Sequence, residues 1–250
     1  MTGETLLEVR DLSAGYNGAA VLRRLNLEVR AGEVVALLGS NGAGKTTTLR
    51  VISGLLRPMG GSVRFNGRNV PTLAPQRLAG LGLVHVPENR GIFHQLTVQE
   101  HFRLCVPHRG EQTVAQALDY FPALRALESR RTGLLSGGEQ QMLALALALA
   151  RNPKLLLLDE LSLGLAPVIV ERLLPVVRRV ADDHGTGVLL VEQHVHLALE
   201  IADRGIVLAH GDPVLEGPSQ VLRDDRKLLM GSYLGETAQL PGEAADTDQA

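Results

Sequence analysis

Hydrophobic and polar residues follow two different patterns along this chain of 250 residues. From Leu25 to Arg30, apolar and polar side chains alternate one by one, which predicts a strand with one buried face. After the Ala31-Gly32 turn, residues 34–38 are apolar without a break, which predicts a strand buried on both faces. We therefore expect residues 6–38 to form β structure.

The rest of the chain is predicted to alternate helices and strands. Because alternation of this kind builds a parallel sheet, we predict an α/β fold with a β-rich N-terminal part and an inserted helical segment near 90–140. We expect helices over 46–56, 98–106, 112–121, 137–151, 167–184 and 195–202. We expect strands over 62–67, with an Asn66-Gly67 turn at its end, and over 82–86, 155–158, 187–191 and 205–209.

Composition narrows the classes of protein that remain. Aromatic residues make up only 3% and tryptophan is absent, so the core must be aliphatic. The net charge of −2 provides no basic footprint for nucleic acid, and we expect no nucleic-acid partner. A single cysteine, Cys105, excludes an internal disulfide, and we expect it to be a small apolar residue on a helix.

No segment of the sequence is long enough to cross a membrane. The longest unbroken apolar run, 142–150, has nine residues and is predicted to be a buried helix, whereas a spanning helix needs about 20. Residues 1–5 lack the features of a signal peptide. We expect the acidic tail 236–250 to be disordered. Any membrane role is therefore expected to depend on partner proteins.

One glycine-rich segment matches the phosphate-binding pattern G-x-x-x-x-G-K-[ST] between a predicted strand and a predicted helix. Glycines allow successive N–H groups to converge on a phosphate, and the helix N-terminus adds partial positive charge. The lysine supplies a full charge and the threonine hydroxyl can ligate Mg²⁺. The segment consists of Gly39, Ser40, Asn41, Gly42, Ala43, Gly44, Lys45 and Thr46. It predicts nucleotide binding.

A second motif is an apolar run, 155–158, that ends in two carboxylates, Asp159 and Glu160. Ligands of parallel sheets bind beyond the carboxyl ends of the strands, so both residues are expected beside the phosphate loop. Asp159 is suited to Mg²⁺. Glu160 is then placed to orient or deprotonate a water that attacks the terminal phosphate.

The third motif starts another helix with two glycines. Ser136 and Glu139 form a capping-box pattern, as Thr97 and Glu100 do elsewhere. Gly137 and Gly138 leave the first N–H groups of this helix approachable, which predicts a second anion-binding helix end.

Together the three motifs resemble the ATP-binding subunit of ABC transporters over roughly residues 5–235. The resemblance implies a P-loop ABC ATPase core over 1–235, with an N-terminal antiparallel β subdomain and a helical subdomain at about 90–140. It also implies ATP and Mg²⁺ as cofactors. A second ABC ATPase subunit, identical or different, and transmembrane permease subunits are the implied partners.

Finer segments resemble the ATPase subunits of branched-chain amino acid importers, a pattern shared by urea and short-chain amide importers. They are residues 86–93, 161–167, 190–193, 202–205 and 232–235. The resemblance implies uptake of such a solute, with a periplasmic solute-binding protein as an indirect partner. It implies a location at the cytoplasmic face of the cell membrane, held there by the permease subunits.

The resemblance also implies roles for single residues. Tyr16 is expected to stack on adenine, and Gly44, Lys45, Thr46 and Thr47 to hold the phosphates and Mg²⁺. Glu88 stands where the wider family has a glutamine that ligates Mg²⁺ or the attacking water. Ser136, Gly137 and Gly138 are expected to contact the ATP of the other subunit.

Two positions depart from the family pattern. The γ-phosphate switch residue is either Gln193, which we favour, or His194. Leu161 replaces the proline that usually follows the catalytic glutamate. These departures keep an alternative function open, a nucleotide-gated binding or regulatory module with little hydrolysis.

Overall fold

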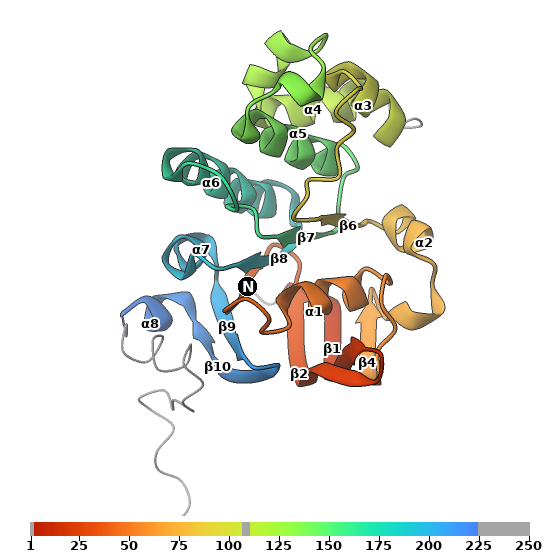
Figure 1. The fold of residues 1–250 in the computed structure, drawn as a ribbon, viewed down its shortest axis with the longest axis vertical. Coiled ribbons are helices and arrows are strands. Elements are labelled where there is room, and N and C mark those ends of the chain that lie inside the picture. The colour runs from red at the N-terminus through yellow and green to blue at the C-terminus, as the bar shows by residue number, and fades with distance from the viewer. Residues whose placement is uncertain (1–2, 107–110, 225–250) are drawn as a thin grey trace, which may run out of the picture.

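A six-stranded sheet forms the centre of the computed structural model, which describes residues 3–106 and 111–224 (Figure 1). The strand order is β10-β9-β3-β8-β7-β6, and all neighbours are parallel except the edge pair β10 and β9. The strands are β3 (Val34–Gly39), β6 (Leu83–Val86), β7 (Leu155–Asp159), β8 (Gly187–Glu192), β9 (Arg204–Ala209) and β10 (Asp212–Pro218). The predicted parallel sheet is confirmed.

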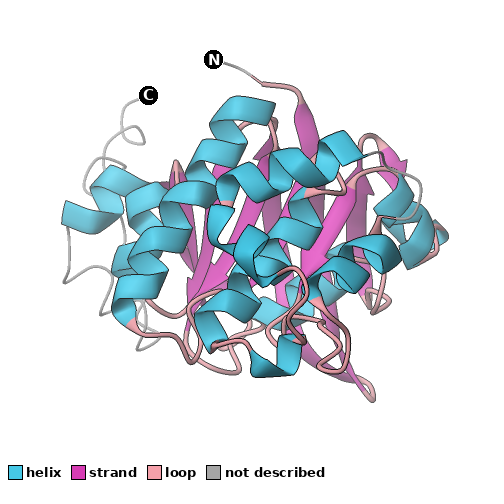
Figure 2. Cartoon of the chain, turned by 90° about the horizontal axis from the view of Figure 1, so that it is seen from above, coloured by secondary structure: helices cyan, strands magenta, loops and turns pink. Residues whose placement is uncertain are grey.

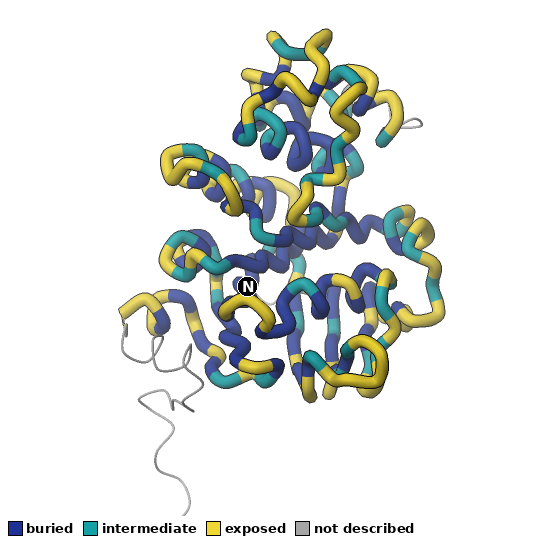
Figure 3. The backbone as a smooth tube through the Cα atoms, viewed as in Figure 1, coloured by how far each residue is buried: buried dark blue, intermediate teal, exposed yellow. Residues whose placement is uncertain are grey.

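Both faces of this sheet are buried, as the unbroken apolar runs predicted. Along β3, Val34, Ala36 and Leu38 belong to one hydrophobic core, whereas Val35 and Leu37 belong to another. This division follows from the strand geometry, because successive side chains point to opposite faces. The first core contains residues of α5, α6 and α7, and the second contains residues of α1 and the N-terminal sheet. Figure 3 shows the central strands buried along their length.

A second, antiparallel sheet comes from the N-terminal part of the chain and has the order β2-β1-β4-β5. Its strands are β1 (Thr5–Tyr16), β2 (Ala19–Arg30), β4 (Gly60–Phe65) and β5 (Arg68–Asn69). Leu25, Leu27 and Val29 are buried, which confirms the predicted half-buried strand. The Asn66-Gly67 turn is also confirmed, with both residues at positive φ, 47° and 70°.

The helices lie around the two sheets. Helices α3, α4 and α5 lie together at one end of the molecule in Figure 1, and Figure 2 shows helices crossing one face of the strands. They are α1 (Lys45–Ile52), α2 (Pro75–Gly80), α3 (Val98–Cys105), α4 (Glu111–Tyr120), α5 (Gly137–Leu149), α6 (Pro167–His184), α7 (Val195–Ile201) and α8 (Ser219–Asp224). Short 3₁₀ turns occur at Val70–Thr72, Pro122–Leu127 and Thr132–Leu134. Every predicted helix is present.

Some boundaries differ from the prediction. Helix α1 ends at Ile52 instead of residue 56, because Gly54 takes a left-handed φ of 74° and the amides of the following residues turn back to the carbonyl of Arg50. The short elements α2, β5, β10 and α8 were not predicted, since none of them contains an apolar run longer than two residues.

Two predictions concern residues outside the described part of the chain. They are the domain limit at 235 and the disorder of the tail 236–250. Within the described residues, no helix has the length and apolar character needed to cross a bilayer.

Candidate functional site

The predicted site residues follow four neighbouring strands of the central sheet. The strands β3, β8, β7 and β6 are adjacent and parallel, so their carboxyl ends meet at one edge. The phosphate-binding loop follows β3, Gln193 follows β8, Glu160 follows β7 and Glu88 follows β6. Residues more than 150 positions apart in the sequence are thereby brought together.

The phosphate-binding loop has the backbone that its glycines permit. Gly44 forms the N-cap of α1 with a left-handed φ of 105°. Gly39 has a φ of 153°, and a Cβ atom added there would lie 2.5 Å from the carbonyl oxygen of Leu208. Both positions exclude other residue types, so the loop shape depends on them. The helix begins at Lys45, and its first N–H groups face the loop.

The side chain of Lys45 lies under the loop and is only 3% exposed. Its Nζ donates hydrogen bonds to the carbonyl oxygens of Gly39 at 2.8 Å and Ser40 at 3.0 Å. The same atom is 3.5 Å from Oε1 of Glu160. Lys45 therefore connects the loop after β3 with the acidic end of β7.

Thr46 and Asp159 offer oxygen ligands to a cation. The Thr46 hydroxyl donates to Oδ1 of Asp159 at 3.2 Å. The pKa of Asp159 is raised from 3.8 to about 6, chiefly by burial, with further contributions from the charges of Glu160 and Glu88. A divalent cation bound beside Asp159 would favour its charged form.

The donor set fits Mg²⁺ together with a nucleotide. No cluster of three His, Cys, Asp or Glu side chains with metal-binding geometry exists within residues 3–106 and 111–224. The described residues therefore contain no metal site that is formed by such side chains alone. Mg²⁺ is commonly held by one or two protein oxygens, with waters and substrate phosphates completing the shell. Thr46 and Asp159 supply two such oxygens beside the phosphate loop.

Glu160 has an uncommon backbone and a specific partner. Its φ is 48°, in the left-handed region, and its N–H donates to the carbonyl of Val191 at 2.9 Å. Nε2 of Gln193 donates to Oε2 of Glu160 at 2.7 Å. His194, in contrast, is an exposed residue at the N-cap of α7. The geometry thus brings Gln193, and not His194, to Glu160.

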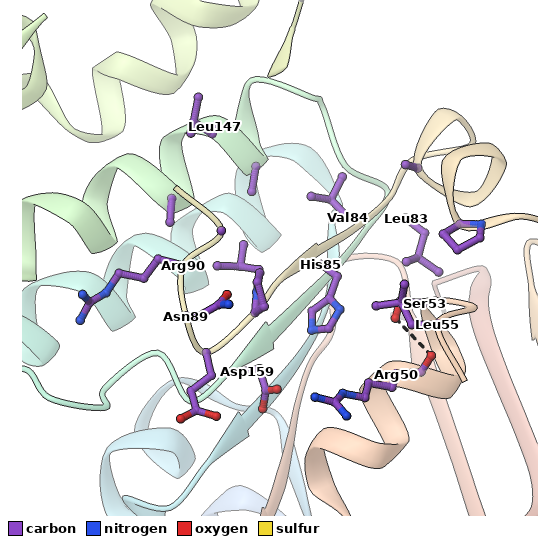
Figure 4. Close-up of a pocket in the computed structure, with 18 of the residues that line it drawn as sticks. Arg50, Ser53, Leu55, Leu83, Val84, His85, Asn89, Arg90, Leu147 and Asp159 are labelled. Carbon is purple, nitrogen blue, oxygen red and sulfur yellow. Dashed lines mark hydrogen bonds between the residues drawn. The ribbon is translucent and has the colours of Figure 1, made fainter. Parts of the chain in front are cut away.

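Glu88 is one of the residues that line a cleft of about 670 Å³, which also contains Thr46 and Asp159 and extends to α2 and α5 (Figure 4). The cleft is lined by residues of α1, α2, β6, α5 and the loop 87–91. Two residues after Glu88, Arg90 takes a φ of 64° and donates to the side-chain oxygens of Gln140 and Gln141, both at 2.9 Å. The loop that carries Glu88 is therefore connected to the start of α5.

The remaining predicted residues lie on β1, on α1 and at the start of α5. Tyr16 is 39% exposed at the end of β1, and its hydroxyl accepts a hydrogen bond from Arg50 at 3.2 Å. The capping boxes at Ser136 and Thr97 are both confirmed. Helix α5, which begins after Ser136, lies well apart from α1 in Figure 1. Gly137 and Gly138 thus form a separate helix end, and Thr47 is buried within α1.

Three residues that shape the site were not found from the sequence. Arg90 links the Glu88 loop to α5, and a buried pair, Ser162 and Glu192, connects the loop after β7 with the last residue of β8. The partners in the buried pair are 30 positions apart. No local pattern in the sequence indicates such contacts.

A phosphate-binding loop with an acidic pair at a nearby strand end defines a P-loop ATPase. The family model for the ABC transporter matches residues 22–162. The chain is 37% identical over 234 residues to the high-affinity branched-chain amino acid transport ATP-binding protein BraG of Pseudomonas aeruginosa, covering 92% of this chain and 100% of that protein. The chain therefore belongs to the ABC transporter family, as one of its ATP-binding ATPase subunits.

Two further comparisons agree with this assignment. The probable branched-chain amino acid transport ATP-binding protein LivF of Archaeoglobus fulgidus is 36% identical over 233 residues, covering 90% of this chain and 99% of that protein. A solved structure of an ATP-binding subunit of an ABC transporter superposes with a TM-score of 0.77 at 30% identity, covering 93% of this chain and 95% of that chain. The predicted family and fold class are confirmed.

Proposed function

We propose that this chain hydrolyses ATP to energise an importer for branched-chain amino acids or a related small polar solute. The observation that carries the proposal is the convergence of Lys45, Thr46, Asp159, Glu160 and Gln193 at neighbouring strand ends. These residues provide a phosphate cradle, cation ligands and a base in one place.

In the proposed reaction, the loop amides and Lys45 bind the phosphates of ATP. Thr46 and Asp159 are the residues that would hold Mg²⁺, which would neutralise phosphate charge when bound. Glu160 accepts a proton from the attacking water, and Gln193 orients the Glu160 carboxylate. Glu88 is a further candidate ligand for the metal or the water. Tyr16 offers an exposed ring for the adenine base.

A second ATPase subunit is proposed to complete each site. Ser136 caps α5 while the backbone N–H groups of Gly137 and Gly138 stay outside the helical hydrogen-bond ladder. Such a helix end attracts a phosphate by its dipole and its amides. Because it lies apart from the phosphate loop of its own chain, we infer that it contacts the γ-phosphate bound to the partner, which is either a copy or a related chain.

Permease subunits are the proposed membrane partners. The cleft beside Glu88 is open to a segment of another chain, and it connects directly to the nucleotide site through Thr46 and Asp159. The chain would then act at the cytoplasmic face of the cell membrane, with a periplasmic solute-binding protein delivering the solute. The names of BraG and LivF support branched-chain amino acids as the solute. Uptake of labelled leucine, compared with urea and acetamide, distinguishes the candidates.

The test of the catalytic proposal is the variant Glu160→Gln in the full chain assembled with its permease subunits. We expect ATP turnover to fall about 100-fold or more, because the general base is lost while the side chain keeps its shape. ATP binding should persist. Lys45→Ala is the contrasting variant, since it should weaken ATP binding itself.

Two results would contradict this assignment. Undiminished turnover in Glu160→Gln would remove Glu160 from its role. A wild-type chain that binds ATP tightly but never releases phosphate would instead favour the nucleotide-gated module. Phosphate release and nucleotide binding are measured on the same preparations.

A further inference from the structure

Glu192 is a buried carboxylate at the end of β8 that the proposed reaction does not use. The residue is 1% exposed, and both of its oxygens face Ser162, which is 5% exposed. The backbone N–H of Ser162 donates to Oε1 at 2.9 Å, and its hydroxyl donates to Oε2 at 2.6 Å. A buried carboxylate is tolerated only when it is well hydrogen-bonded, and an apolar side chain could fill the space without that requirement. A hydrogen-bonded acidic side chain at this buried place therefore points to a role beyond packing.

Three consecutive residues at the end of β8 hold the loop that follows β7. The carbonyl of Val191 accepts the N–H of Glu160 at 2.9 Å. Glu192 accepts both hydrogen bonds of Ser162. Gln193 donates to the carboxylate of Glu160 at 2.7 Å. The first part of the loop is thus held by β8 and the residue after it at three points, which are the Glu160 backbone, Ser162 and the Glu160 carboxylate.

Glu160 depends on such support because of its backbone. A φ of 48° lies in the left-handed region, which residues with a Cβ atom seldom adopt. The next residue, Leu161, has no ring to restrict its φ as a proline has. Leu161 is buried, at 1% exposed, and the hydrogen bonds of Ser162 add a second anchor one residue further on. Loss of the Ser162 anchor would loosen this conformation. The carboxylate would then move from its place between Lys45 and Gln193.

We propose that the Ser162–Glu192 pair is a positioning device for the catalytic carboxylate of Glu160. The inference rests on the proposed function of Glu160. The pair acts on the chemical step and not on ATP binding, because its hydrogen bonds join the loop after β7 to the end of β8 and none of them reaches the phosphate loop. Glu192 and Ser162 are positioning residues and touch no reacting atom.

The experiment compares Ser162→Ala, Glu192→Gln and the double variant in the full chain with its permease subunits. Each single change should lower kcat about 10- to 100-fold, since a small displacement of a reacting group has effects of this size. The KM for ATP should stay within about twofold of the wild type. The kcat of the double variant should lie within about twofold of that of the slower single variant. Both changes break the same contact, so their effects should not add.

A matched control lies at the opposite end of β8. Thr186 is a buried residue, 1% exposed, whose hydroxyl donates to the carbonyl of Pro153 at 3.0 Å. Thr186→Val should lower the melting temperature as the Ser162 variant does, but it should leave kcat unchanged. Glu192→Gln keeps the size of the side chain, so it reports on the pair even where Ser162→Ala folds poorly.

The outcomes separate this inference from the proposed function. If kcat is unchanged in Ser162→Ala and Glu192→Gln while Glu160→Gln is inactive, the positioning role is wrong and the proposed function stands. If Thr186→Val lowers kcat as much, the effect is general destabilisation and the inference also fails. A wild-type chain without ATP turnover overturns both.

Discussion

At the scale of single residues, His85 shows how burial changes the chemistry of one group. It lies on β6 beside the cleft, and its Nε2 is enclosed without a hydrogen-bond partner among the described residues. Burial, helped by the positive charge of Arg50, lowers the pKa of His85 from 6.5 to about 4. The neutral imidazole is therefore the form that the fold accommodates.

This shift predicts a pH dependence of stability. Between pH 6.5 and about 4 the unfolded chain binds a proton at His85 while the folded chain does not, so acidification favours unfolding. The full contribution is present above pH 6.5, and about 3 kcal/mol of unfolding free energy is lost by pH 4. The His85→Leu variant should lose less unfolding free energy over the same pH range, because it has no imidazole to protonate. Urea denaturation of both proteins between pH 7.5 and 4.5 measures the difference, and parallel curves would contradict the prediction.

At the scale of elements, two helices start with the same chemistry and provide a comparison. Thr97 and Ser136 each accept the N–H of a glutamate three positions later, and each glutamate accepts the N–H of the capping residue. The proposed function gives the second helix end an additional task, which is contact with a nucleotide on the partner subunit. The first has none.

Removing the caps separates the two roles. Thr97→Ala and Ser136→Ala should each lower the unfolding free energy by about 1 kcal/mol. Only Ser136→Ala should reduce ATP-dependent dimerisation, measured by light scattering or size-exclusion chromatography with an inactive Glu160→Gln chain. Equal dimerisation of both variants would show that the Ser136 helix end does not contact the nucleotide.

These elements also show what the sequence can predict. Both capping boxes, the Asn66-Gly67 turn and the unbroken strand at 34–38 depend on residues close in sequence, and each was predicted correctly. The phosphate loop and the Asp159-Glu160 pair could be placed together because parallel strand ends share one edge of a sheet. The Ser162–Glu192 contact could not be predicted, because it depends on which strand lies next to β7 in the sheet. Strand order is a property of the whole fold.

At the scale of the whole molecule, the cleft joins the nucleotide site to the surface between α2 and α5. Ala79 on α2 lines it, whereas Ala74, just before α2, is exposed and does not. A large side chain at Ala79 should obstruct a permease segment without touching the phosphate loop.

The variant Ala79→Trp should therefore keep the basal ATP turnover of the isolated chain. Solute uptake by the assembled transporter should fall about tenfold or more, because the tryptophan ring would occupy the space that the permease segment needs in the cleft. Ala74→Trp is the matched control and should retain uptake. Normal uptake in Ala79→Trp would mean that the cleft is not the contact with the permease.

The strand order has a consequence for the synthesis of the protein. β3, which carries the phosphate loop, has β8 and β9 as its two neighbours, and both come from the last third of the chain. While a ribosome has yet to add residues beyond 186, the loop already exists but its strand lacks both neighbours. Cellular ATP can stabilise only a formed site, so a nascent or prematurely terminated chain gains no protection from it. Nucleotide binding would thereby report that translation has passed β8 and β9.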